Sequence, residues 1–198
     1  MSFLYSGPIL SVVRNIRAVG PIVLFQVSAP AEHPRDHFTP QGCTINQNGS
    51  VWFLPDILSG KEERTCTIPH DKAILVPLLT GMCDDDNTDP TVKTDEGLRN
   101  CTMAGDEYGA ISASLDGSKL QDLNQYKTQT RFFNLTIPKD NFANLVPGTF
   151  KSMADGFFVF LKPLPVGKHD LVLTTSVSNP ITPSFNYAAE SVYHLDIK

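Results

Sequence analysis

The residues best suited to chemistry in this sequence are the acidic side chains that follow Cys83. With Asp85 as position 1, Asn87 and Asp89 fall at positions 3 and 5. Glu96 falls at position 12, where a calcium-binding loop places the carboxylate that closes the coordination shell. The candidate calcium ligands are therefore Asp84, Asp85, Asp86, Asn87, Asp89 and Glu96.

This segment departs from the calcium-loop pattern at one position and in its surroundings. Pro90 stands where such loops need glycine for a sharp turn, and the flanking sequence predicts no long helix. Calcium tolerates irregular geometry, so a calcium site outside that loop class stays open. The alternative is a solvated acidic loop held between Cys83 and Cys101, because runs of charge are commonly exposed.

A second candidate for chemistry is the pair His33 and His37, whose i, i+4 spacing would direct two imidazoles at one metal ion on a helix. Pro34 makes a helix there unfavourable, and Asp36 would have to join the pair from a loop. A secreted hydrolase or metal-dependent enzyme built on these residues is the alternative to a non-catalytic function. We find no G-x-S-x-G nucleophile motif and no glycine-rich phosphate loop, and we assign no catalytic residue.

The four cysteines, Cys43, Cys66, Cys83 and Cys101, form no C-x-x-C pair and therefore lack zinc-ribbon or thioredoxin spacing. An even number of widely spaced cysteines is typical of disulfides formed in an oxidising compartment. Of the possible pairings we favour Cys43 with Cys66 and Cys83 with Cys101, because each closes a short local loop. Four buried free thiols in a cytosolic protein remain the alternative.

Three sequons, at Asn48, Asn100 and Asn134, are compatible with a secreted glycoprotein without establishing one. The net charge of −5 argues against nucleic acid as a partner and against an anionic membrane surface. Arg14 and Arg17 interrupt the only long apolar stretch, so no segment reaches the roughly 18–20 residues of a transmembrane helix.

Residues 1–30 form an N-terminal segment with two interpretations, and residues 31–198 form one domain. Arg14 and Arg17 precede an apolar run, Ala18–Val27, and Ala29-Pro30-Ala31 has the small residues of an export cleavage site. The favoured alternative is a short helix, Ile9–Ile16, that leads into a first strand, Ile22–Val27.

From residue 50 onward, alternating apolar and polar residues predict a series of short strands, with 13 glycines and 15 prolines to supply turns. Pro77 predicts a bulge or an edge position, and Asp116-Gly117 predicts a tight hairpin. Trp52 lies in an apolar strand, which favours core packing over sugar stacking. The predicted strands are Val51–Leu54, Arg64–Ile68, Ala73–Leu79, Ala110–Leu115, Arg131–Ile137, Phe157–Leu161, Lys168–Thr175 and Ser191–Ile197.

Helix signals are few. Thr94 is a favourable N-cap for a helix that ends at Met103, and Asp140–Leu145 predicts a single turn. His169 is expected to cap the turn after Gly167, and His194 to point outward from the last strand. The sequence therefore predicts an all-β, mainly antiparallel, two-sheet β-sandwich or jelly-roll-like fold with one or two short helices.

Two stretches carry a family resemblance. The first comprises Gly42-Cys43, Val51–Leu54, Arg64–Pro69 and Lys72–Pro77, and the second Ala154–Phe157 and Leu161–His169. Together they resemble a group of uncharacterised secreted prokaryotic proteins with paired cysteines, over about a third of the chain. The resemblance implies export and a β-rich fold, and it transfers no active site because its motifs are turns and strands.

These observations predict a secreted or cell-surface binding or structural module, stabilised by two disulfides and by a calcium ion if the acidic segment binds one. The expected location is extracellular, at the cell surface or periplasmic. The partner would be a protein or a glycan at the cell surface, met across a sheet face or through the loops near Asp84–Asp95. A subunit of an extracellular assembly is a further alternative, and an oligomer is compatible with each of these functions.

Overall fold

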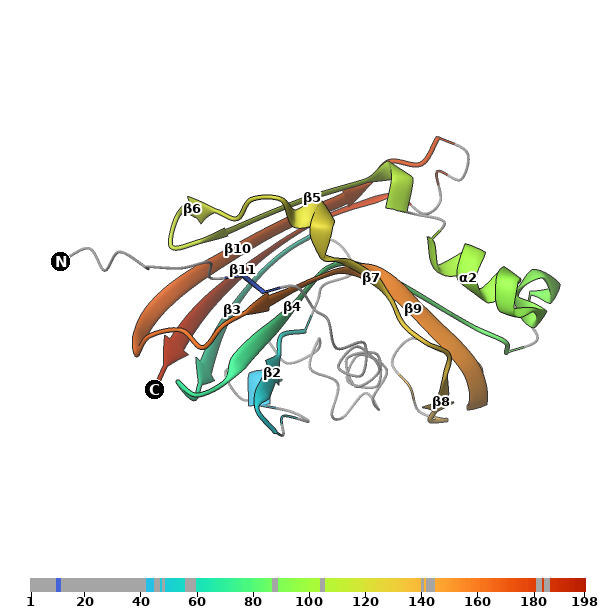
Figure 1. The fold of residues 1–198 in the computed structure, drawn as a ribbon, viewed down its shortest axis with the longest axis horizontal. Helices are drawn as coiled ribbons and strands as arrows, with labels where there is room; N and C mark the ends of the chain where they lie inside the picture. Colours follow the sequence, from blue (N-terminus) through green and yellow to red (C-terminus); the bar gives the residue numbers. More distant parts are fainter. Residues whose placement is uncertain are drawn as a thin grey trace.

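The described residues of the chain form two β-sheets and one α-helix, which lies beyond one end of the sheets (Figure 1). The computed structural model spans the whole sequence. It describes residues 10–11, 42–44, 47, 49–55, 60–86, 89–103, 106–139, 141, 145–180, 183 and 186–198. The predicted all-β, two-sheet fold is confirmed, and each sheet contains one parallel pair among its antiparallel ones.

Sheet A is built on the 14-residue strand β9 (Gly148–Leu161). One edge of β9 pairs antiparallel with β4 (Ala73–Asp84), which in turn pairs in parallel with β2 (Val51–Phe53). Along its other edge β9 pairs in succession with three short strands: β8 (Phe133–Ile137), β7 (Lys127–Gln129) and β1 (Leu10–Ser11). The strands β1, β4, β7 and β8 therefore all pair with β9, and β2 is joined to it through β4.

Sheet B has the strand order β3-β11-β10-β5-β6. At its centre β10 (Gly167–Val177) pairs antiparallel with β11 (Tyr187–Ile197) over the full length of both strands. The edge strand β3 (Gly60–Ile68) runs parallel to β11. On the opposite side, β5 (Gly109–Leu115) pairs with β10 and forms a hairpin with β6 (Ser118–Lys119).

Helix α2 (Asp95–Met103) packs against β4 and β9 and lies at the far end of the molecule from the C-terminus (Figure 1). The Thr94 hydroxyl oxygen accepts a hydrogen bond from the Gly97 amide at 3.0 Å, so the predicted N-cap is confirmed. The described residues also form the 3₁₀ turns η4 (Gly42–Thr44), η5 (Pro90–Lys93), η6 (Asp106–Tyr108) and η7 (Leu123–Tyr126).

The main apolar core lies between the two sheets, and a second cluster lies against β9. Successive residues of β9 alternate between them: Phe157 and Val159 belong to the main core and Phe158 to the second cluster. Trp52 is in the main core and 8% exposed, which confirms its predicted packing role. Its indole Nε1 is buried without a hydrogen-bond partner among the described residues.

Two local predictions are confirmed by the backbone. The β4–β9 register shifts between Pro77 and Leu79, so Pro77 is accommodated by a bulge in an inner strand. Asp116 and Gly117 have φ angles of 52° and 74° and connect β5 to β6. Positive φ at both central residues is the requirement of a tight hairpin turn whose twist matches that of the strands.

Other predictions differ from the structure. The strand predicted over Phe157–Leu161 is longer in the structure, because β9 begins nine residues earlier at Gly148 and includes Gly156. The small and polar residues in Lys151–Asp155 give this part of β9 no apolar pattern from which a strand could be predicted. Leu10–Ser11 were predicted to be helical and instead form β1. The rest of that helix, the strand Ile22–Val27 and most of the turn at residues 140–145 lie outside the described residues.

Gly156 occupies a backbone position that only glycine fits. Its φ is +152°, and a Cβ added there would lie 2.3 Å from the Leu79 carbonyl oxygen of the adjacent strand. Both the dihedral angle and the close approach of β4 exclude a side chain.

We expect Gly156→Ala to lower the free energy of unfolding by at least about 2 kcal/mol, because backbone strain and a clash with Leu79 act together. Gly117→Ala is the matched control: its φ is also positive but nothing lies within 4 Å of the added Cβ, so a loss of about 1 kcal/mol is expected. Urea denaturation of both variants checks this. Equal losses would contradict the role of the β4 contact.

Candidate functional site

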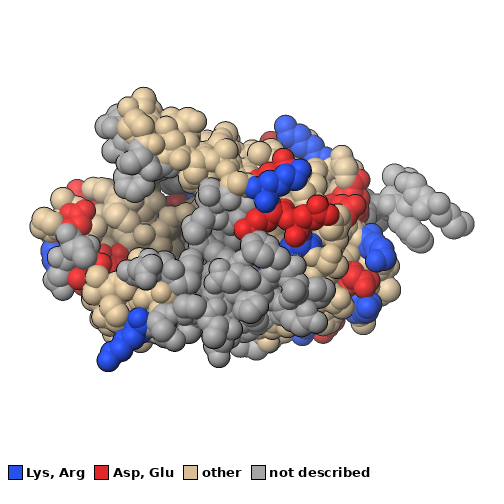
Figure 2. Space-filling view, turned by 180° about the vertical axis from the view of Figure 1, so that it is seen from behind, with Lys and Arg blue, Asp and Glu red and all other residues tan. Residues whose placement is uncertain are grey.

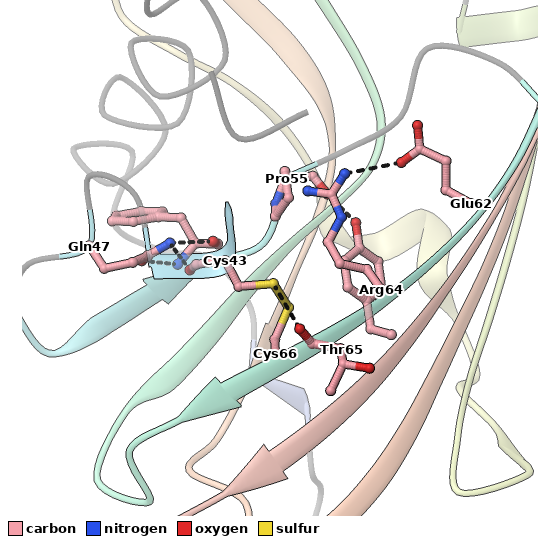
Figure 3. Close-up of a disulfide and its surroundings, with 9 residues drawn as sticks. Cys43, Gln47, Pro55, Glu62, Arg64, Thr65 and Cys66 are labelled. Carbon is pink, nitrogen blue, oxygen red and sulfur yellow. Dashed lines mark hydrogen bonds and ion pairs between the residues drawn. A yellow bond between two sulfur atoms is a disulfide. The ribbon is translucent and has the colours of Figure 1, made fainter. Parts of the chain in front are cut away.

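The first candidate region is the corner where the disulfide Cys43–Cys66 joins the two sheets (Figure 3). Cys43 lies in η4, just before the sheet A edge strand β2, and Cys66 lies in β3 at the edge of sheet B. Both cysteines are fully buried, with a Cα–Cα distance of 5.5 Å. This is one of the two pairings that loop length favoured, and it joins the η4 turn to the edge strand of sheet B.

The side chain of Gln47 holds the segment that contains Cys43 against strand β2. Its amide Nε2 donates to the carbonyl oxygens of Cys43 at 3.2 Å and Phe53 at 2.8 Å. Its Oε1 accepts from the Phe53 amide at 2.9 Å, so one side chain pairs with both polar groups of a β2 residue (Figure 3). The Cys43 loop is therefore tied to sheet A by hydrogen bonds and to sheet B by the disulfide.

A buried polar cluster lies beside the disulfide. Arg64 is 2% exposed and donates from Nη2 to Glu62 Oε2 at 3.2 Å. The Tyr193 hydroxyl, also buried, donates to the Pro55 carbonyl oxygen in the segment that follows β2 (Figure 3). A buried charge is tolerated only when it is paired, and Glu62 provides that partner within the same strand.

Sequence analysis did not single out Arg64, although a signal was present. In β3 the side chains of Arg64, Cys66 and Ile68 alternate inward, and all three are buried. Period-2 alternation therefore places an arginine at a core position of an edge strand. A charged residue in such a position requires a local partner, and Glu62 lies two residues away on the same face.

The second candidate region is the acidic segment with α2. The disulfide Cys83–Cys101, with a Cα–Cα distance of 6.1 Å, joins the end of β4 to the last turn of the helix. Asp85 continues the β4–β9 ladder: its amide donates to the Lys151 carbonyl oxygen at 3.1 Å, and its Oδ1 accepts from the Lys151 amide at 2.9 Å. Asp95 forms an ion pair with the Lys151 ammonium group.

The electrostatics of this segment reflect crowding and local hydrogen bonds. Burial raises the pKa of Asp84, and the neighbouring carboxylates of Asp86 and Asp85 raise it further. Hydrogen bonds from the Thr91 hydroxyl and amide lower the pKa of Asp89, which caps η5. The acidic residues therefore differ in function: some have protein partners, and Asp84 lies in a site that disfavours its negative charge.

The predicted calcium ligands are brought together only in part. Asn87 lies outside the described residues, and Glu96 is exposed in the first turn of α2. Within the described ranges, no group of three or more His, Cys, Asp or Glu side chains is placed to hold a metal ion. The calcium site stays a prediction of the sequence.

The remaining predicted sites have different outcomes. His33, His37 and the sequon at Asn48 lie outside the described residues. Asn134 is exposed on β8. Asn100 is exposed on α2, but the third residue of its sequon, Thr102, is 4% exposed and donates its hydroxyl to the Arg99 carbonyl oxygen at 2.9 Å.

The third candidate region is a histidine–carboxylate row on the outer face of sheet B, which the sequence analysis left without a function. His194 Nδ1 lies 2.6 Å from Asp170 Oδ1 on β10, and its Nε2 lies 2.8 Å from Glu63 Oε1 on β3. Hydrogen bonds to Glu63 and then Asp170 raise the pKa of His194. The outward orientation of this residue was predicted, but its two partners depend on strand register.

His169 lies at the end of the same sheet, in line with the inward residues Leu171 and Leu173 of β10, and its side chain is only 10% exposed. Its Nδ1 lies 2.8 Å from Asp116 Oδ2, and its Nε2 lies 3.0 Å from the Pro165 carbonyl oxygen. Asp116 Oδ1 also accepts from the Asp170 amide at 2.9 Å. The β5–β6 hairpin and the turn before β10 are thus joined through one imidazole, in agreement with the predicted turn-capping role.

Charges of opposite sign are interspersed over the face drawn in Figure 2. Beside α2, the guanidinium of Arg99 and the ammonium of Lys151 lie over the Phe132 ring, at 4.7 Å and 4.2 Å from its centroid. On sheet B, Lys61 pairs with Glu190 at 2.7 Å across the β3–β11 edge. Among the described residues, no helix is long and apolar enough to cross a membrane.

Comparisons with known proteins add little. No family model and no curated protein matches the chain. Among solved structures, one neighbour is a cysteine protease inhibitor from Entamoeba histolytica, with 13% identity over 75% of this chain and 95% of that chain and a TM-score of 0.27. A similarity of this size carries no information about the fold or function of this chain.

We expect removal of either disulfide to destabilise the protein by about 2–4 kcal/mol, with different spatial patterns. The Cys43→Ser/Cys66→Ser variant should raise hydrogen exchange in both sheets, because it unlinks them. The Cys83→Ser/Cys101→Ser variant should raise exchange mainly in α2 and η5. Native-state hydrogen exchange of the two variants measures this, and identical patterns would contradict the distinct roles assigned to the two bridges.

Proposed function

We propose that this chain is a binding or structural module that acts in an oxidising compartment, outside the cell, at its surface or in the periplasm. The observation that supports it best is the position of Cys43–Cys66, fully buried and joining the two sheets. Stable disulfides are typical of proteins in oxidising compartments and are rare in the cytosol. The likeness of two stretches to secreted prokaryotic proteins with paired cysteines supports the same location.

The outer face of sheet B is the surface we propose for contact with a partner. Val172 and Val192 face each other across β10 and β11 near its centre, with Glu63, Asp170 and His194 around them. The other outward side chains are small, β-branched or charged: Lys61, Thr65, Thr67, Ala110, Ser112, Ser114, Lys168, Thr174, Ser176, Ala188, Glu190 and Asp196. A broad face of this composition suits a protein partner better than a sugar, which would stack on aromatic rings.

Calcium is part of this proposal as a structural ion of the acidic segment. Burial first, and then the carboxylates of Asp86 and Asp85, raise the pKa of Asp84, and a bound cation would offset the repulsion among these three carboxylates. The ion would stabilise the connection between β4 and α2 and would take no part in catalysis.

We expect protein from its natural source to contain both disulfides. Its intact mass should rise on reduction by the four hydrogens that its four cysteines take up, and alkylation without reduction should modify no thiol. The same spectrum reports glycan mass, for which Asn134 is the most accessible described sequon. Four freely alkylated thiols would overturn the proposed location.

We further expect a partner to protect the outer face of sheet B. Amine acylation of undisturbed source material should label Lys61 and Lys168 less than acylation of the purified protein does. Lys139, which is exposed in the turn after β8, is the control and should be labelled equally in both samples. Mass spectrometry of the labelled peptides measures this, and equal labelling of all three lysines would contradict the assignment of this face.

A further inference from the structure

Two carboxylates hold the imidazole of His194 from opposite sides. Asp170 is directly opposite His194 in the β10–β11 register, and its Oδ1 lies 2.6 Å from Nδ1. Glu63 lies diagonally across the parallel β3–β11 pair, and its Oε1 lies 2.8 Å from Nε2. The ring therefore bridges three neighbouring strands on the outer face of the sheet.

This geometry selects one protonation state of the ring. An ionised carboxylate accepts hydrogen bonds and cannot donate them. Each ring nitrogen of His194 must therefore carry a proton to bond its carboxylate, and only the imidazolium has both. In the neutral ring, one nitrogen lone pair would face a carboxylate oxygen, and that contact would become repulsive.

We propose that protonation of His194 stabilises the pairing of the edge strand β3 with the rest of sheet B. The pairing of β3 is therefore most stable at mildly acidic pH, and β3 opens more readily as the pH rises. The proposal goes beyond the binding function proposed above and does not depend on it. Strand β3 also contains Cys66, so the strand that His194 stabilises is the one joined to Cys43 by a disulfide.

The other charged groups near His194 come from the same three strands and one turn. Lys61 of β3 pairs with Glu190 of β11, and Asp196 of β11 pairs with Lys198 at 3.0 Å. On β10, Lys168 precedes Asp170 on the outer face, and Asp116 of the β5–β6 turn accepts from the Asp170 amide. Asp170 and Glu63 are the two groups that contact the imidazole itself.

The direction of the effect follows from the chemistry. Because Glu63 and Asp170 raise the pKa of His194 in the folded state, the protonated ring favours folding. This stabilisation is complete below the value of about 6.5 for an unfolded histidine, as long as the carboxylates stay ionised. It is lost as the pH rises through the folded-state value.

The proposal is tested first by NMR titration of the histidine ring protons in the full chain. His194 should titrate above the value of about 6.5 of an unperturbed histidine, because both ring nitrogens face a carboxylate. Glu63→Gln and Asp170→Asn should each move the His194 midpoint downward. A His194 midpoint at or below about 6.5 would overturn the proposal.

Hydrogen exchange tests the consequence for β3. Protection factors of the β3 amides should fall about two- to fivefold between mildly acidic and mildly alkaline pH, the range expected for an exposed ion pair. In His194→Gln this pH dependence should vanish, whereas in the control His70→Gln it should persist. If His194→Gln does not fold, Glu63→Gln removes the β3 contact alone and should show the same loss. A β3 response that is independent of His194 and Glu63 would overturn the proposal.

Discussion

The structure depends on the burial of β9 on both of its faces. One face of the strand packs into the core between the sheets, and the other contributes Phe158 and Ala154 to a second apolar cluster. A strand buried on both sides can have no row of exposed polar residues, which explains its run of aromatic and aliphatic side chains from Phe157 to Leu161. Its length provides the register for β4 on one edge and for three short strands on the other.

Close pairing of β9 with β4 has consequences at particular residues. Gly156 permits the two backbones to approach where any Cβ would meet Leu79, and the bulge at Pro77 lets a residue without an amide proton sit in an inner strand. The two deviations lie close together along the pair, between Pro77–Leu79 on β4 and Gly156–Phe158 on β9. They show how a central strand can tolerate residues that sheets usually exclude from their interior.

The two disulfides join short elements to the strands of the sheets. Cys43–Cys66 joins the three-residue turn η4 to β3 inside the main core. Cys83–Cys101 holds a nine-residue helix against the end of sheet A, and helices this short are marginal without tertiary support. Covalent bonds therefore reinforce two of the short elements of the fold.

Much of the architecture followed from the sequence alone. Alternating apolar residues predicted the strands, Thr94 predicted the start of α2, and Asp116-Gly117 predicted the hairpin, because each of these signals acts within a few residues. Loop length favoured the two cysteine pairings that the structure contains. The first half of β9 escaped prediction because its polar residues, such as Asp155, are buried by elements distant in the sequence.

Tertiary structure decided which side chains meet. No local pattern relates His194 to Glu63 and Asp170, since 131 residues separate Glu63 from His194 and only the register of three strands brings the three residues together. Likewise, alternation could place Arg64 on an inward face, but only the folded chain pairs it with Tyr193, whose hydroxyl donates to the Pro55 carbonyl oxygen. Local patterns determine whether a segment is a strand and which face it buries. Contacts across strands depend on register and sheet order, which are set by the packing of the whole chain.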